Sequence, residues 1–177
     1  MKKYERFILG VLAFCCFTLQ VLFVLASIIL VIMAFPADSR QEMFKIVSEG
    51  MVLKNSMLSV TTASVYLFAV SVVQSILMFG YLNCIRNLLQ NLNDEIYFEE
   101  RNLQLIKKVL IFYGASAVIE ALVAGFNKIN HITLLTATSP SALVYLFEGF
   151  LVVMGIYVIY MVFKHGVRLK KESDAFI

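Results

Sequence analysis

The sequence is poor in charge and cysteine, and it contains no tryptophan. Charged residues make up 15% of its 177 residues, against about 25% in an ordinary soluble domain, while hydrophobic residues make up 60%. It has three cysteines, two of them adjacent, which is not the pattern of a disulfide framework. The composition therefore excludes an ordinary soluble domain and a disulfide-rich secreted one.

The chain also lacks the signatures of common catalytic and metal sites. It contains no HExxH, GxSxG or GxxxxGK[ST] pattern, and no Cys/His spacing typical of metal ligands. Its basic residues are scattered at the ends of apolar segments instead of being interleaved with aromatics on one face, as in a nucleic-acid surface. We therefore expect no enzymatic activity, cofactor, metal or direct nucleic-acid binding.

What the sequence does contain is a set of four long apolar segments. At a rise of about 1.5 Å per residue, the first exceeds a hydrocarbon core of about 30 Å, and it is too long for a signal peptide. We predict an all-α integral membrane four-helix bundle that forms a single transmembrane domain, residues 1–177. The four spans are expected at about residues 7–35, 57–85, 107–127 and 142–163.

Pro36 ends the first span, and the loop after it, residues 36–56, has apolar residues at helical spacing. Asp38 or Ser39 could cap a short helix whose apolar side is formed by Met43, Phe44, Val47 and Met51. Such a helix would suit the outer membrane surface. The alternative is a plain polar connector with chance spacing.

The distribution of Lys and Arg orients the spans. Three precede the first span, four lie between the second and third and four follow the fourth, whereas the other two loops hold three and one. The count is therefore 11 against 4, and the positive-inside rule places the richer side in the cytoplasm. We predict a multi-pass protein of the cell (plasma) membrane with both termini in the cytoplasm.

Amphipathic patterns flank the connection between the second and third spans. Apolar residues recur there at spacings of three and four, at Leu82, Ile85, Leu88, Leu89, Leu92, Leu103, Ile106, Val109 and Leu110. A helix that leaves the bilayer must bury such a stripe, most simply against the next helix. Residues 82–110 are therefore predicted to form a helical hairpin that extends helices 2 and 3 into the cytoplasm.

Two carboxylates lie inside predicted spans, and an intramembrane acid is a candidate functional site. Glu120 and Glu148 each lie six residues from the outer end of a span, so both are expected at one depth in the outer half of the bilayer. Facing each other, they could share a proton or bind a cation. Alternatively each is structural, protonated or bonded to Tyr, Ser, Lys128 or His131.

Other isolated polar residues have simpler interpretations. Gln20 and Gln74 lie in the middle of spans, where side-chain amides typically form hydrogen bonds between helices. Cys84 lies at the inner edge of the second span, where a palmitoyl group could be attached. Its position is the one feature that favours this modification.

Two short motifs carry a family resemblance. The first contains Leu88, Leu89 and Leu92, followed by Phe98 and Asn102; the second closes the chain with Gly166, Leu169, Glu172, Asp174 and Ile177. With these residues the sequence resembles a bacterial four-span membrane family catalogued as domain of unknown function 2975. The four-span layout matches over the whole chain, and the motifs cover about 30 residues.

The chain departs from this family at two places. Glu99 stands where the family often has Ser or Thr, and Ala175-Phe176 where it often has Leu-Thr. The first difference removes a hydroxyl N-cap, so we expect the start of the third helix to be capped differently. Family members look as though they commonly accompany small helix-turn-helix regulators, so the resemblance implies a membrane partner of a transcription factor.

The C-terminal tail combines basic residues, which suit anionic headgroups, with an acidic and apolar tip. It could dock on the hairpin or on a soluble partner, or remain a frayed, solvated end. Our leading hypothesis is a non-enzymatic regulatory or interaction protein whose partners are membrane lipid and a cytoplasmic transcription regulator, with a homo-oligomer also open. The alternative is a small transporter, channel or bacteriocin-immunity-type protein that uses Glu120 and Glu148.

Overall fold

Four long helices dominate the computed structural model, which describes residues 3–34, 51–53, 60–134 and 142–175. They are α1 (Lys3–Ala34), α3 (Val60–Asn93), α4 (Glu100–Ile129) and α5 (Ala142–Asp174). Each is long and apolar enough to cross a membrane. The prediction of an all-α, four-span membrane bundle is thereby confirmed, and the chain is a multi-pass membrane protein.

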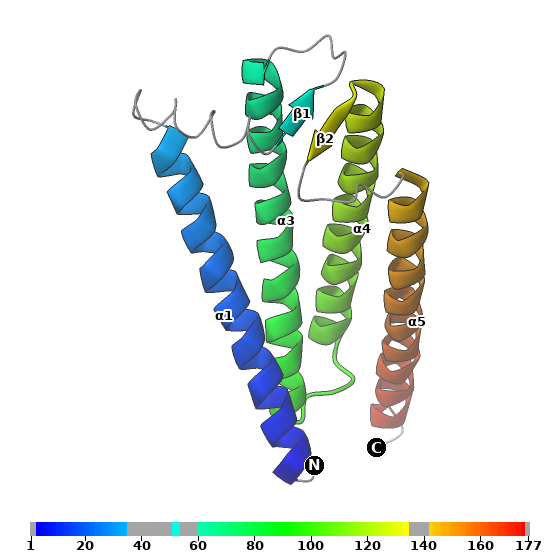
Figure 1. Ribbon diagram of the computed structural model, residues 1–177. Coiled ribbons are helices and arrows are strands. Elements are labelled where there is room, and N and C mark those ends of the chain that lie inside the picture. The colour runs from blue at the N-terminus through cyan, green and yellow to red at the C-terminus, as the bar shows by residue number, and fades with distance from the viewer. Residues whose placement is uncertain (1–2, 35–50, 54–59, 135–141, 176–177) are drawn as a thin grey trace.

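The helices pack in the order in which they occur along the chain (Figure 1). α1 packs against α3, α3 against α4, and α4 against α5, so α1 and α5 form the two edges. The outward faces of these edge helices expose large apolar side chains, among them Phe14, Leu22, Phe147 and Leu151. Lipid solvates such a surface well, which explains why so apolar a chain needs only a small core.

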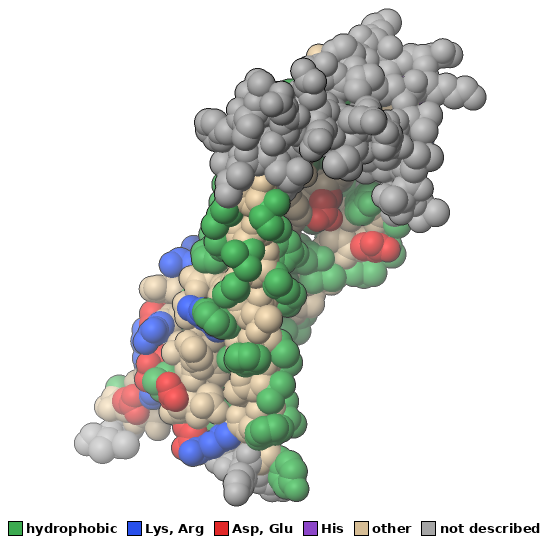
Figure 2. Space-filling model, turned by 60° about the vertical axis from the view of Figure 1, so that its left-hand side comes forward, with side chains coloured by type: hydrophobic (Ala, Val, Ile, Leu, Met, Phe, Trp, Pro, Cys, Tyr) green, Lys and Arg blue, Asp and Glu red, His purple; other side chains and the backbone are tan. Residues whose placement is uncertain are grey.

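The two chain termini and the connection between α3 and α4 lie at one end of the bundle, here called the terminus end (Figure 1). Lys, Arg, Asp and Glu side chains gather toward this end, beside an apolar face (Figure 2). α3 continues to Asn93 and α4 begins at Glu100, so the predicted helical hairpin is confirmed. Its cytoplasmic location stays a prediction.

Two short strands lie at the opposite end, here called the strand end (Figure 1). β1 (Met51–Leu53) pairs antiparallel with β2 (Ile132–Leu134), and Met51 stands opposite Leu134. The apolar loop helix predicted after Pro36 falls mostly outside the described residues. At Met51 that prediction is wrong, because this part of the loop pairs with β2, whose Ile and Thr are β-branched residues that favour strands.

Glycines allow close approach between neighbouring helices at two levels. A methyl group at Gly149 of α5 would lie 2.7 Å from the Ala117 Cβ of α4, closer than real contacts. A methyl group at Gly80 of α3 would lie 2.9 Å from the Phe112 ring of α4. Small residues bring helix backbones together in membranes, where packing replaces the hydrophobic effect as the main attraction.

Candidate functional site

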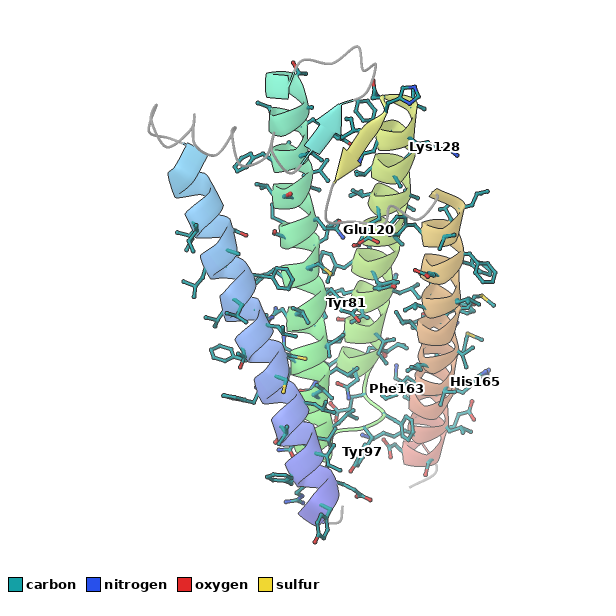
Figure 3. The ribbon with its side chains drawn as sticks, viewed as in Figure 1. Tyr81, Tyr97, Glu120, Lys128, Phe163 and His165 are labelled. Atoms are coloured by element: carbon teal, nitrogen blue, oxygen red, sulfur yellow. The ribbon has the colours of Figure 1, made fainter. Side chains whose placement is uncertain are left out.

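Glu120, one of the two predicted intramembrane acids, is bound to the neighbouring helix (Figure 3). Gln74 Nε2 of α3 donates a hydrogen bond to Glu120 Oε1 at 2.6 Å and a second one to Ser116 Oγ. Ser116, one turn before Glu120 on α4, is buried, and its hydroxyl donates a long bond of 3.5 Å to the same carboxylate oxygen. These residues form a polar cluster that joins α3 to α4.

Glu148, the second acid, lies outside this cluster. It is exposed on α5, and no hydrogen bond or ion pair joins it to Glu120, Lys128 or His131 in the described part of the chain. Its neighbour Gly149 packs on Ala117, one turn before Glu120, so the two acids do lie at similar depths. The structure therefore brings the acids to one level and binds only Glu120 to another helix.

Exchanging the acids for amides separates a structural role from a charge-dependent one. In Glu120→Gln the side-chain oxygen can still accept the Gln74 bond, so we expect the free energy of unfolding to stay within about 0.5 kcal/mol of the native value. Glu120→Ala loses this acceptor and should cost about 1 kcal/mol. Glu148→Gln and Glu148→Ala should both be neutral. Reversible unfolding in mixed micelles measures these values, and equal losses for Gln and Ala at position 120 would show that the charge itself is required.

The other mid-span amide, Gln20, joins α1 to α3. It is 4% exposed, and its Oε1 accepts a hydrogen bond of 3.1 Å from Arg86 Nη1. Arg86 also donates to Asn83 Oδ1 at 3.3 Å and lies over the ring of Phe17, 5.7 Å from its centroid. The prediction that Gln20 and Gln74 form hydrogen bonds between helices is confirmed.

Cys84 is buried, with 5% of its surface exposed. An acyl transfer requires a thiol that a membrane enzyme can reach, and this thiol lies in the helix interface instead. The burial of Cys84 therefore disfavours palmitoylation at this position. Within the described residues, no group of three or more His, Cys, Asp or Glu side chains could hold a metal.

Asn102 organises the connection between α3 and α4. Its side chain is fully buried, with 0% exposed, and its Oδ1 accepts a hydrogen bond of 2.6 Å from Asn91 Nδ2. Its own Nδ2 donates to the backbone carbonyls of Ile96 and Tyr97 at 2.7 and 2.8 Å. The family-motif asparagine thus ties the end of α3, the connecting turn and the start of α4 together.

The backbone of this turn is closed without glycine. Glu95 adopts a left-handed conformation with φ of 63°, its N–H donates to Leu92 O, and the Ile96 N–H donates to Asn91 O. This is the double hydrogen-bond pattern of a Schellman C-cap. The Glu95 carboxylate hydrogen-bonds to Arg6 of α1 at 2.5 Å, and this bond lowers the pKa of Glu95.

The start of α4 lacks a side-chain cap, as the replacement of a hydroxyl residue by Glu99 predicts. Glu99 has extended dihedrals, φ −122° and ψ 152°, and makes no side-chain hydrogen bond to the helix. Its carboxylate lies 3.7 Å from Lys170 Nζ on α5, and Lys171 Nζ donates to Glu100 Oε2 at 2.7 Å. The acidic first turn of α4 therefore faces the basic tail.

The tail is helical and docks on the hairpin. Phe98 lies against the ring of Phe163, with centroids 5.7 Å apart, and against Gly166, where any methyl group would overlap its ring. The ion pairs around it are exposed, and such pairs contribute at most about 1 kcal/mol each. The contact between Phe98 and α5 is therefore the main attachment of the tail.

The described family-motif positions converge at the terminus end. Phe98, Asn102 and Gly166 form the contacts above, Glu172 pairs with Arg168 at 2.8 Å, and Leu169 and Asp174 lie exposed on the same helical turns. Ile177 lies outside the described residues. We call residues 94–102 together with residues 163–174 the hairpin–tail platform.

Sequence reasoning missed three pairings in this region. It named Asn102 without its partner Asn91, and it did not connect Glu99 and Glu100 with the lysines of the tail. The opposite charges of these two short runs were the available signal. It also missed the contact of Arg86 with Gln20, which no spacing in either helix indicates.

Comparison with known proteins identifies a family. Residues 52–177 match the family described as "Protein of unknown function (DUF2975)". No curated protein and no solved structure matches the chain. The matched range contains α3, α4 and α5, and with them the hairpin–tail platform and both intramembrane acids.

Proposed function

The chain belongs to the DUF2975 family, and from this premise we propose that it is a non-enzymatic regulatory or interaction protein of the bacterial cell membrane. Its hairpin–tail platform binds a soluble cytoplasmic partner, a small helix-turn-helix transcription regulator. Both termini and the platform lie on the side with 11 of the 15 Lys and Arg residues, which supports a cytoplasmic location.

The observation that carries this proposal is that the described family-motif positions come together on one surface, the hairpin–tail platform. Asn102 fixes the turn, and Phe98 attaches the tail to it, so both the turn and the tail are held by side-chain contacts. Leu169, 65% exposed, and Tyr97 remain accessible beside charged side chains. A rigid surface with exposed apolar residues among charges suits the recognition of a protein.

A groove beside this attachment supports the same proposal. It has a volume of about 500 Å³ and is almost entirely apolar, and it is lined on the platform by Phe98, His165, Gly166 and Leu169. A partner helix could insert an apolar side chain here, as in helix-in-groove recognition. The rest of the lining, residues 157–162, belongs to the predicted fourth span, and Leu169 is the lining residue of α5 furthest along the chain from it, so it is the residue to change.

The transport alternative has less support. A proton or cation path would use both acids together, whereas Glu120 is held by Gln74 and Ser116 and no hydrogen bond joins it to Glu148. Proteoliposome flux that depends on either acid would restore this alternative.

Binding between the full-length protein and a helix-turn-helix regulator encoded beside its gene tests the proposal. We expect a two-hybrid assay in bacterial membranes to detect the pair, and Leu169→Asn to weaken it at least tenfold. Ile129→Asn is the matched control, since Ile129 is also an exposed apolar residue but lies at the strand end. Equal binding by both variants, or absence of binding by the native chain, would refute the proposal.

A further inference from the structure

A polar groove lies between α1 and the hairpin, and no described residue of α5 lines it. It has a volume of about 810 Å³ and a mostly polar lining. α1 contributes Gly10, Phe14 and Phe17, while α3 contributes Arg86 and Gln90 and α4 contributes Arg101. We call it the Arg86 groove. The groove shares Asp94 and Arg101 with the hairpin–tail platform, but it is separate from the apolar groove on α5 that is proposed for the regulator.

The charge of Arg86 is not compensated. Within the part of the chain that the structure describes, its guanidinium contacts the neutral amides Gln20 and Asn83 and the ring of Phe17, and its Nε is buried without a hydrogen-bond partner. Arg101, the second arginine of the groove, forms no ion pair within the described ranges.

Asp94 is the one carboxylate among the residues that line the groove. The lining therefore carries one net positive charge. A partly buried arginine in a membrane protein normally has an anionic partner, and among the described residues none forms an ion pair with Arg86.

An apolar groove continues along the same seam toward the strand end. Its volume is about 390 Å³, and its lining includes Val24 and Ile28 of α1 and Val72, Ile76 and Phe79 of α3. It offers no charged group at all. Such a groove suits an acyl chain.

Helical spacing places both grooves on one face of the seam. On α3, Ile76 and Phe79 of the apolar groove are followed by Arg86 and Gln90 of the polar one at intervals of three, seven and four residues. On α1, positions 10, 14 and 17 of the polar groove are followed by 24 and 28 of the apolar one at intervals of four, three, seven and four. These intervals keep residues on one side of a helix.

We propose that the seam between α1 and α3 is a binding site for an anionic phospholipid. The phosphate of its headgroup lies between Arg86 and Arg101, and an acyl chain follows the apolar groove. Arg86 is the first charged residue after the uncharged stretch 55–85, so it lies where a helix leaves hydrocarbon and meets headgroups. Guanidinium groups bind phosphate through paired, charge-assisted hydrogen bonds.

A free phosphate ion would satisfy the same arginines but would leave the apolar groove unused. The two sources therefore differ in their dependence on the acyl chain. A phospholipid ligand requires both grooves, and shortening its chains should weaken binding even when the headgroup is unchanged.

The test uses the full-length protein in nanodiscs of neutral phosphatidylcholine, with dioleoyl phosphatidylglycerol titrated in and bound lipid counted by native mass spectrometry. We expect saturable binding that is at least tenfold weaker in the double variant Arg86→Gln, Arg101→Gln, since each arginine near a headgroup contributes about fivefold. The double variant Arg168→Gln, Lys171→Gln is the matched control, because it also removes two positive charges at the terminus end but away from the seam. It should bind as the native chain does.

Two further measurements complete the test. Dihexanoyl phosphatidylglycerol should bind at least tenfold more weakly than the dioleoyl lipid, and inorganic phosphate at the same concentration should not compete with the lipid. Equal lipid binding by the double variant and the native chain would overturn the proposal, as would full competition by phosphate. If the double variant does not fold, lipid binding by the single variant Arg101→Gln is the test. The Arg101 side chain is exposed and forms no ion pair with a described residue, so its replacement should not disturb the fold.

Discussion

Replacing Asn102 with alanine is expected to lower the free energy of unfolding by about 1 to 3 kcal/mol, because the buried Asn91 amide and two partly buried carbonyls of the turn then lose their hydrogen-bond partner. Asn91 is 5% exposed, so its Nδ2 would stay buried without a partner, whereas the carbonyls of Ile96 and Tyr97 lie in a partly buried turn. Each unsatisfied buried group costs about 1 to 3 kcal/mol. An effect of this size is a large fraction of the whole stability of many small domains, about 5 to 15 kcal/mol.

Reversible unfolding of the purified protein in mixed micelles, followed by circular dichroism, measures this loss. Asn93→Ala is a suitable control, since Asn93 lies on the same hairpin and its side-chain oxygen is buried without a partner. Asn102→Asp should be as harmful as alanine, because it removes the two donated bonds and places a charge in a fully buried site. A stability of Asn102→Ala within about 0.5 kcal/mol of the native value would contradict this account.

The loss should extend beyond the turn itself. Ile96 and Tyr97, whose carbonyls Asn102 holds, directly precede Phe98, which attaches the tail. A turn without Asn102 can no longer fix the position of that ring. The family-motif residues of the hairpin and of the tail therefore act as one unit, although 60 or more residues separate them in the sequence.

The four helices could be predicted because their cause is local. An uncharged run long enough to cross a bilayer must satisfy its backbone internally, and only a helix does so within a single segment. The helix ends depend on distant contacts. Beyond Phe163 the sequence turns basic, yet α5 continues to Asp174 because Val167 is buried and the lysines meet the acidic start of α4.

In the candidate sites, too, some features follow from the local sequence and others depend on contacts between helices. Counting residues from the span ends brought Glu120 and Glu148 to similar depths, and the contact between Gly149 and Ala117 agrees with that count. The count could not show that Gln74 points toward Glu120, because the rotation of one helix against another is set by packing along the whole interface. Depth follows from the sequence of one helix, whereas a hydrogen bond needs two.

Substituting leucine for Gly149 is expected to be the most damaging change between α4 and α5. Even a methyl group would lie 2.7 Å from the Ala117 Cβ, so a leucine must push the two helices apart. Overpacking of this kind typically costs about 1 to 3 kcal/mol, and it acts here between two helix backbones that leave little room to adjust. α5 packs chiefly against α4, so no other helix interface compensates.

The separation should also release the tail at the terminus end, although that contact lies several turns away. A bifunctional thiol reagent that spans cysteines placed at Glu100 and Lys171, whose long side chains meet with charged atoms 2.7 Å apart, reports the docked tail by crosslinking when the native cysteines are replaced by serine. We expect the crosslinking yield to fall at least threefold in Gly149→Leu. Gly155→Leu, on the same helix, has no atom within 4 Å of its added Cβ and should leave both stability and yield unchanged. Normal crosslinking in Gly149→Leu would show that the hairpin holds the tail by itself, so that Phe98 and its neighbours dock α5 without help from the rest of the interface.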